Sequence, residues 1–488
     1  MELVVKGGTI ITAEGTFRGD VGVTDGRIAR LGEFPCPGGV EVVDATGKWV
    51  LPGVVDAHTH LEDVGDNGTP TADDFLSGTC AAAAGGITTI IDFVTPATGQ
   101  PPSQAVRQRR RQAEAKAVVD FALHCCIPEA GLVTAQEAER LLAEGISSVK
   151  LFTAYAGLAL DTLSLYQVMQ RAVDVGSAEG GRARSGLTVF VHAENGEIID
   201  HYRQRFAKEG KKDPYYHARS RPPFTELEAV ARVLVLHSAV GSVGGSQARL
   251  CFAHVTTAAA LDAIRQARRH GQAVFAETCP HYLLFDEAKL QGRDGELFIM
   301  SPPLRSVEDS HALWQGLTAG DLDIVSTDHC PFPAAAKRGR PFYEVASGVG
   351  SIELLLSLVL SEAVLKPTPP RLSPNRMVAL LSTNPARIFG LYPRKGSLAP
   401  GADADLVVVD PAATCTVGVA ALHGNEDHSI YEGMTLRGAV ETTISRGEII
   451  YHRGRVLARP GRGHFLHRPF GNGLRGNRPA GRHLPEGP

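Results

Sequence analysis

The chain has 488 residues, with 49 Lys and Arg against 53 Asp and Glu, so its formal net charge at pH 7 is −4. This balance excludes a strongly basic protein that binds nucleic acid or an anionic membrane surface. Hydrophobic residues make up 43% and charged residues 21% of the chain, which is typical of a globular protein with a large core and excludes collagens, coiled coils and disulfide scaffolds.

The chain has the sequence features of a soluble, cytoplasmic protein. No apolar run approaches the roughly 18 residues of a membrane span, and the first residues lack the basic and apolar regions of a signal peptide. The eight cysteines include no CxxC pair, so we expect buried thiols rather than disulfides.

Short strand-like runs bounded by Gly, Asp or Asn mark both ends of the chain. They lie at 3–11, 20–24, 27–31 and 40–44, and again at 405–410, 439–445 and 448–452. Their period of two indicates antiparallel strands. We therefore predict one small β-sandwich domain built from two segments, residues 1–50 and 391–465.

Between these ends, apolar strands alternate with helical segments. The predicted strands are 50–58, 87–93, 118–125, 147–153, 188–192, 248–254, 273–278 and 322–328. The helical segments are 103–117, 134–143, 164–175, 224–239, 258–269 and 308–316, with two more helices at 351–364 and 374–389. The alternation predicts an α/β fold, a TIM-like (β/α)8 barrel over residues 51–390. We expect the insertions near 195–225 and 279–310 to be loops over the active face, and residues 471–488 to be a disordered tail.

Metal-ligand residues stand at the predicted C-terminal ends of barrel strands. His58 and His60 form an HxH pair, His192 and His254 end two later strands, and Asp328 ends the last strand. Catalytic groups gather at this face of a barrel. Alternate residues of a strand end project to the same side, so both imidazoles of the HxH pair can reach one ion. The coincidence predicts a metal site.

Lys150 lies inside an apolar strand, in the sequence Ser-Ser-Val-Lys-Leu-Phe-Thr. Burial lowers the pKa of a lysine because desolvation disfavours the ammonium form. A neutral amine beside metal ions can react with carbon dioxide to give a carbamate, which is an anionic ligand able to bridge two metals.

In these motifs the sequence resembles the cyclic amidohydrolases, and within them the hydantoinase/dihydropyrimidinase branch. The resemblance covers the chain to about residue 470. The blocks that carry it are 53–60 (GVVDAHTH), 71–75 (TADDF), 85–92 (GGITTIID), 149–155 (VKLFTAY), 192–195 (HAEN), 277–282 (ETCPHY), 301–305 (SPPLR) and 327–332 (TDHCPF). Further matches lie at 382–386, 388–410 and 460–463.

This resemblance implies hydrolysis of the cyclic amide bond of 5,6-dihydropyrimidines or hydantoins to N-carbamoyl amino acids. It implies two divalent metal ions, usually zinc, held by His58, His60 and Asp328 on one side and by His192 and His254 on the other. Lys150, as N6-carboxylysine formed with carbon dioxide or bicarbonate, would bridge them together with a hydroxide. The hydroxide attacks the ring carbonyl, and Asp328 shuttles the proton to the leaving nitrogen.

The resemblance also implies residues that bind the substrate. Tyr155 matches the tyrosine that stabilises the developing oxyanion, and Ser301 matches the residue whose backbone holds the cyclic imide. Ser347 stands where the branch has an asparagine that contacts the ring, and the loop at 61–68 is more polar than its counterpart and lacks its phenylalanine. These departures leave the substrate open, with a ring smaller or more polar than an aryl-hydantoin as one candidate.

Other readings of the sequence remain open. Allantoinase is the nearest alternative activity, and dihydroorotase, a mononuclear enzyme without a carboxylated Lys150 and a non-catalytic scaffold are the others. His281 and His329 lie inside the motifs, and we expect both to support the ligands rather than to bind metal. The expected partner is a small-molecule cyclic amide, without nucleic acid or membrane, and the resemblance implies a homotetramer.

Overall fold

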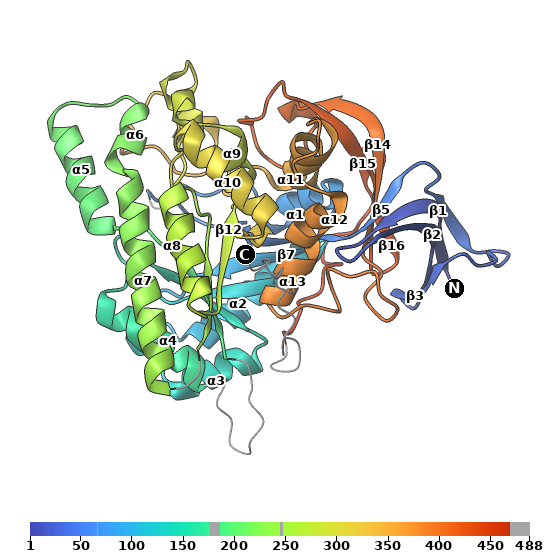
Figure 1. Cartoon of the computed structure of the whole chain (residues 1–488), viewed down its shortest axis with the longest axis horizontal. Helices are drawn as coiled ribbons and strands as arrows, with labels where there is room; N and C mark the ends of the chain where they lie inside the picture. Colours follow the sequence, from blue (N-terminus) through green and yellow to red (C-terminus); the bar gives the residue numbers. More distant parts are fainter. Residues whose placement is uncertain (66, 176–185, 245–246, 469–488) are drawn as a thin grey trace, which may run out of the picture.

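A computed structural model of the chain describes residues 1–65, 67–175, 186–244 and 247–468. The predicted disordered tail at 471–488 lies outside these ranges. The frame consists of a parallel sheet of eight strands and a second sheet of nine strands. In Figure 1 the second sheet, with its N-terminal strands in blue and its C-terminal strands in orange, lies to one side of the helix-covered parallel sheet.

The eight parallel strands form the barrel. In order they are β6 (Val54–Thr59), β7 (Ile87–Val94), β8 (Asp120–Cys126), β9 (Ser148–Phe152), β10 (Thr188–His192), β11 (Arg249–Phe252), β12 (Val274–Thr278) and β13 (Ile324–Val325). Nearly all of their residues are buried, as expected of strands covered on both faces. A parallel bridge pairs Thr59 with His329, and the His60 amide donates to the His329 carbonyl at 2.8 Å. The sheet thereby closes on itself, which confirms the predicted (β/α)8 barrel.

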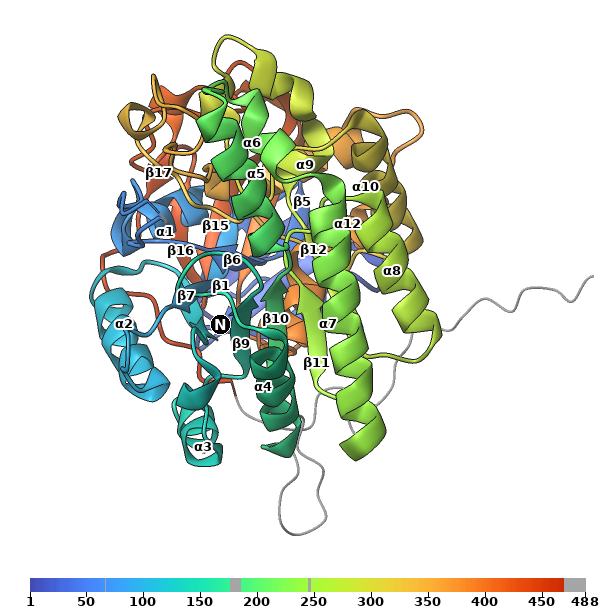
Figure 2. The same ribbon diagram turned by 90° about the vertical axis from the view of Figure 1, so that its left-hand side faces the viewer.

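Helices cover the outside of the barrel (Figure 2). They are α1 (Phe75–Ala84), α2 (Pro102–Lys116), α3 (Ala135–Ala143), α4 (Thr162–Asp174), α7 (Pro223–Gly244), α8 (Ala258–Arg269) and α10 (Val307–Ala319), with a 3₁₀ turn η1 (Ala130–Leu132) before α3. In α8 the Thr257 side chain accepts the Ala260 amide as an N-cap, and Leu261 and Ile264 are buried. Apolar residues at helical spacing form a stripe along α8, and this stripe packs the helix against the barrel.

The two insertions that were expected to be loops contain helices. They hold α5 (Gly196–Lys208), α6 (Tyr215–Ser220), α9 (Pro280–Leu284), η2 (Glu287–Gln291) and η3 (Gly295–Phe298), and α5, α6 and α9 lie at one end of the barrel (Figure 2). The prediction of loops is wrong for α5 because its ends are well capped. Asn195 accepts the Ile198 amide, Glu197 lies in the first turn and Lys208 in the last, so the charges complement the helix dipole.

Short helical segments follow the last barrel strand. They are η4 (Ala334–Ala336), η5 (Ile352–Leu354), α11 (Leu355–Val359), η6 (Leu360–Leu365), α12 (Pro374–Val378), η7 (Ala379–Thr383) and α13 (Asn384–Ile388). The two predicted helices at 351–364 and 374–389 are present, but each passes from an α-helical into a π-helical stretch, η6 and η7.

Strands from both chain ends form the second sheet. They are β1 (Leu3–Ile11), β2 (Thr16–Thr24), β3 (Arg27–Gly32), β4 (Glu41–Asp44), β5 (Trp49–Pro52), β14 (Leu406–Thr416), β15 (Thr435–Ser445), β16 (Glu448–His452) and β17 (Arg455–Val456), with a 3₁₀ turn η8 (Val419–Ala421) between β14 and β15. The two ends meet where β5 pairs antiparallel with β14, so that Val50 lies opposite Val408. A core that includes Leu3, Val50 and Leu406 holds them together. This confirms the small domain built from both ends, while its boundaries at 1–50 and 391–465 stay a prediction.

The described residues contain neither a helix that could span a membrane nor a disulfide bond. No helix in those ranges has both the length and the apolar character to cross a bilayer. All eight cysteines are free thiols, and Cys125, Cys126, Cys251 and Cys279 are buried. Cys36, Cys80 and Cys330 are only partly buried, and Cys415, near the end of β14, is exposed, so the expectation of burial is wrong for these four.

Candidate metal centre and catalytic cavity

A cavity of about 570 Å³ lies at the C-terminal ends of the barrel strands. Every predicted site residue lines it: His58, His60, Lys150, Tyr155, His192, His254, Ser301, Asp328 and Ser347. Residues from the loop at 61–68 and from α5 also line it. Barrel closure is what collects these side chains, since each strand contributes only one or two of them.

His58, His60 and Asp328 form one tight group in the cavity. Their ligand atoms lie within 4.8 Å of one another, and Asp328 Oδ1 is 3.0 Å from His58 Nε2 and 3.3 Å from His60 Nε2. Burial lowers the pKa of His60, but the Asp328 and Asp63 carboxylates outweigh burial and raise the pKa to about 9. In the metal-free protein a proton therefore lies where the three side chains converge, and a divalent cation can replace that proton.

Carboxylates on the outer side orient both of these imidazoles. Nδ1 of His58 lies 2.7 Å from Glu277 Oε1, and Nδ1 of His60 lies 3.1 Å from Asp63 Oδ2. A carboxylate accepts the Nδ1 proton of each imidazole, so each Nε2 can offer its lone pair to a cation once that cation has displaced the proton shared by His60 and Asp328. Carboxylate–imidazole–metal chains of this kind are usual in metalloenzymes.

His192 and His254 form a second group on neighbouring strands. Nδ1 of His192 lies 2.9 Å from Nε2 of His254, and Nε2 of His192 lies 2.9 Å from Glu194 Oε2. Burial lowers the pKa of both imidazoles, so neither carries a charge at neutral pH. When Glu194 accepts the Nε2 proton, His192 Nδ1 is left with a lone pair directed at His254, an arrangement that suits a shared cation.

Lys150 lies between the two groups in chain order, in β9, and is only 1% exposed. Its Nζ contacts the rings of Phe190 at 4.1 Å, Phe93 at 5.0 Å and Phe152 at 5.5 Å. Among the described residues it has no hydrogen-bond partner. Burial lowers the pKa of Lys150, as the sequence predicted. A buried amine without a partner is costly, so this position fits a lysine that carries a further group.

The backbone is strained at three site residues. Tyr155, His254 and Asp328 have φ values of 77°, 33° and 47°, in the left-handed region that non-glycine residues rarely adopt. Such conformations persist only where the surrounding structure enforces them, and they cluster at functional sites.

Tyr155, Ser301 and Ser347, which the resemblance predicts to bind the substrate, all lie in the wall of the cavity. The Tyr155 ring lies 4.9 Å from the His192 ring, between centroids. The segment before Ser301 is held by buried His217, whose Nε2 lies 2.8 Å from the Met300 carbonyl oxygen. Ser347 lines the same cavity together with Gly348 and Val349, and it is the residue that stands where the resembled branch has an asparagine.

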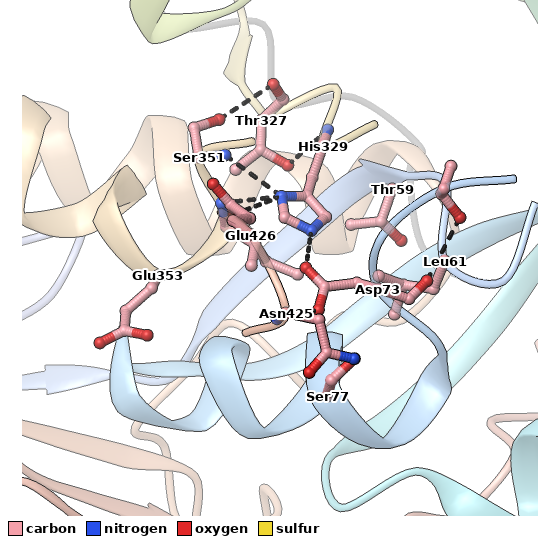
Figure 3. Close-up of polar contacts among 12 residues, drawn as sticks. Thr59, Leu61, Asp73, Ser77, Thr327, His329, Ser351, Glu353, Asn425 and Glu426 are labelled. Carbon is pink, nitrogen blue, oxygen red and sulfur yellow. Dashed lines mark hydrogen bonds and ion pairs between the residues drawn. The ribbon is translucent and has the colours of Figure 1, made fainter. Parts of the chain in front are cut away.

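A second group with metal-ligand side chains is formed by Asp73, His329 and Glu426. Figure 3 shows the His329 ring between the Asp73 carboxylate and the backbone at Ser351. His329 Nε2 lies 3.0 Å from Asp73, and Nδ1 accepts the Ser351 and Ile352 amides at 3.1 and 3.3 Å. Both ring nitrogens are thus engaged without an ion, so this group holds loops together, in line with the supporting role expected for His329.

His281 is buried against the cavity wall. Neither ring nitrogen has a hydrogen-bond partner within the described ranges, and burial lowers its pKa to about 4. It does not join either group of ligand atoms in the described structure.

The sequence motifs did not predict the carboxylates that orient the imidazoles of the candidate ligands. Glu194 and Glu277 stand inside the quoted motifs HAEN and ETCPHY, and Asp63 lies three residues after His60. Their positions could have identified them, because an acidic residue at or just beyond the end of a buried strand needs a hydrogen-bond partner.

Family, sequence and structure comparisons all match this chain to amidohydrolases. A model of the amidohydrolase family matches residues 49–450. The chain is 37% identical to a D-hydantoinase of Ralstonia pickettii over 96% of this chain and 99% of that protein. It is 38% identical to a D-phenylhydantoinase of Escherichia coli O7:K1, with the same two coverages. The crystal structure of a dihydropyrimidinase from Brevibacillus agri, 35% identical, superposes with a TM-score of 0.90 over 96% of this chain and 99% of that one.

Proposed function

Because the chain belongs to the amidohydrolase family, we propose that it is a metal-dependent hydrolase of cyclic amides. It opens 5,6-dihydropyrimidines or hydantoins to N-carbamoyl amino acids. Water adds across the ring amide: its OH joins the carbonyl carbon, its remaining proton joins the nitrogen, and the C–N bond between them breaks. The observation that carries the proposal is the convergence of imidazoles and a carboxylate in one cavity beside the unpartnered amine of Lys150.

We assign the ligands as follows: His58, His60 and Asp328 would hold one divalent cation, and His192 and His254 would hold a second. Lys150, as a carboxylated lysine, would be a ligand shared by both, since its amine is buried and its lowered pKa favours the neutral form that reacts with carbon dioxide. Nitrogen and oxygen donors suit zinc, although such ligands also accept manganese, cobalt or nickel. Two cations held there would supply an acidified water and a polarised ring carbonyl.

The chain's own side chains then handle the proton and the developing charge. Asp328 accepts the proton of the attacking water and delivers it to the leaving ring nitrogen. The Tyr155 hydroxyl stabilises the negative charge that develops on the carbonyl oxygen. The backbone at Ser301 and Ser347 holds the ring amide, and the imidazole of His217 keeps the 300–301 segment in place.

The remaining assignments follow from the resemblance. The partner is a small cyclic amide, without nucleic acid or membrane, and we propose a homotetramer in the cytoplasm. Light scattering on the purified protein would test the oligomer, with a mass of about four chains expected.

A ring-opening assay tests the function. Purified protein is given zinc and bicarbonate and is assayed with dihydrouracil, unsubstituted hydantoin, phenylhydantoin and allantoin, with a chelated sample as the control. We expect metal-dependent opening of the dihydropyrimidine or hydantoin rings and none of allantoin. Opening of allantoin alone would reassign the activity to allantoinase, and no turnover by protein with two bound metals per chain would contradict the proposal.

A further inference from the structure

One positive charge at the cavity is not used by the proposed reaction. Helix α5 turns one side to the cavity, and Gly196, Ile199, Asp200 and Arg203 line it. Steps of three and four residues place these positions on one side of a helix. Arg203 is therefore presented to the cavity by a capped helix rather than by a loose loop.

One hydrogen bond holds the guanidinium of Arg203, and its other N–H groups have no protein acceptor in the described residues. It donates one hydrogen bond to the backbone carbonyl of Tyr343. In the described part of the chain it has no carboxylate partner. An arginine offers five N–H donors in a planar fork, so most of them remain for a ligand.

Arg203 also lies close to the residue that we assign to the ring. A small second cavity is lined by Arg203, Arg221 and Ser347, and the same three residues line the catalytic cavity. Arg221 already faces a carboxylate, since its Nη1 lies 2.5 Å from Glu194 Oε2. Arg203 instead forms no ion pair with a carboxylate among the residues that the structure describes.

We propose that Arg203 selects rings whose substituent at the ring carbon ends in a carboxylate, an inference that rests on the proposed function. The apolar stem of the substituent packs along Ile199, and the carboxylate receives the N–H fork of the guanidinium, a match in shape and charge. The products are N-carbamoyl derivatives of acidic amino acids.

Asp200 carries the opposite charge and therefore allows a second test of the proposal. It is exposed and lines the same cavity one helical turn before Arg203, so its carboxylate disfavours an anionic substituent. Removing the charge of Asp200 and removing that of Arg203 must therefore change the selectivity in opposite directions.

The test compares two hydantoins that differ only in charge, the 5-(2-carboxyethyl) and the 5-(2-carbamoylethyl) compounds. The ratio of their kcat/KM values is measured for the zinc-loaded wild type, Arg203→Gln, Arg203→Lys and Asp200→Asn. Arg205→Gln is the matched control, because Arg205 lies two residues along the same helix and pairs with Glu209 at 2.8 Å, away from the cavity.

We expect the wild type to favour the carboxylate by about tenfold or more. Arg203→Gln should bring the ratio to one or below, because Asp200 still faces the substituent in that variant. Arg203→Lys should keep part of the preference, Asp200→Asn should raise it, and Arg205→Gln should leave it unchanged. Added salt should weaken the preference because the charges are partly exposed. A purely structural Arg203 would instead lower turnover of both rings by the same factor.

A wild-type ratio at or below one, or a ratio unchanged by Arg203→Gln, would overturn the inference while ring opening itself continued. If no ring is opened, the proposed function fails separately. In that case the dissociation constants of the two hydantoins are measured by calorimetry on the same zinc-loaded variants. Their ratio then tests the role of Arg203 by the same criteria.

Discussion

Oε1 of Glu277 lies 2.7 Å from Nδ1 of His58 and accepts the backbone amide of His254 at 3.2 Å. One buried carboxylate on β12 thus contacts a residue from each of the two groups of metal-ligand side chains. It fixes the ring of His58 and the backbone that presents His254, although neither residue is its neighbour in sequence.

Replacing this carboxylate should weaken metal binding. We expect Glu277→Gln to reduce zinc affinity by about 10- to 100-fold, because an amide no longer fixes the tautomer of His58 in the same way. Competition with a chromogenic chelator measures the change. Glu353→Gln is the matched control, since Glu353 pairs with His423 at 2.9 Å outside the cavity; equal effects of both variants would contradict this role.

Lys150 should determine how many metal ions are bound. We expect Lys150→Ala to hold fewer than two metal ions per chain and to lose activity, because the substitution removes the proposed bridging ligand. Elemental analysis gives the metal content. An independent check loads the metal-free wild type with zinc and ¹³C-bicarbonate and looks for a carbamate carbon signal that is absent in Lys150→Ala. Unchanged metal content in the variant would rule out the bridge.

Metal uptake should depend on pH in a defined direction. Burial lowers the pKa of His60, yet Asp328 and Asp63 raise it to about 9, so the metal-free imidazole is protonated at neutral pH. The incoming ion must displace that proton, and zinc affinity should rise as pH increases toward 9 by up to about tenfold per pH unit. Calorimetry in buffers of different ionisation enthalpy would detect the released proton. An affinity that stays flat between pH 6 and 8 would contradict the expectation.

Removal of the Tyr155 hydroxyl should affect catalysis more than binding. We expect Tyr155→Phe to lower kcat by about 100- to 1,000-fold with little change in KM or in metal content, because in the proposed mechanism the hydroxyl acts on charge that develops only in the transition state. Steady-state kinetics and elemental analysis on the same preparation provide the comparison. A variant with a normal kcat would remove Tyr155 from the mechanism.

A buried charge group should control the stability of the whole molecule. Lys395 Nζ lies 2.6 Å from Asp120 on the barrel and 2.7 Å from Asp405 before β14. Loss of this ammonium leaves buried carboxylates uncompensated, so Lys395→Met should reduce the free energy of unfolding by about 3 kcal/mol or more. Thermal unfolding measures this, with Arg27→Met as the control, because Arg27 reaches Asp403 at 3.9 Å from an exposed position and should contribute little.

The same group predicts a loss of stability in acid. Burial raises the pKa of Asp120, but Lys395 and Arg446 outweigh burial and keep the pKa below its ordinary 3.8. A carboxyl with a lowered pKa stabilises the fold above about pH 4, and this contribution is lost as the pH falls below that value. The difference in unfolding temperature between the wild type and Lys395→Met should therefore shrink on acidification.

The sequence by itself determined the features that depend on neighbouring residues. Alternation of apolar strands with helical segments gave the barrel, and the positions of His58, His60, His192, His254 and Asp328 at strand ends marked the candidate ligands. Both signals are local, because backbone geometry fixes which way successive side chains point.

Only the tertiary structure decided which distant groups meet. The contact of Glu277 with His58, the pairing of β5 with β14 and the presentation of Arg203 by α5 all join segments that local pattern treats as independent. The packing of each element against its neighbours fixes these contacts, since the register and tilt of each element depend on everything packed against it.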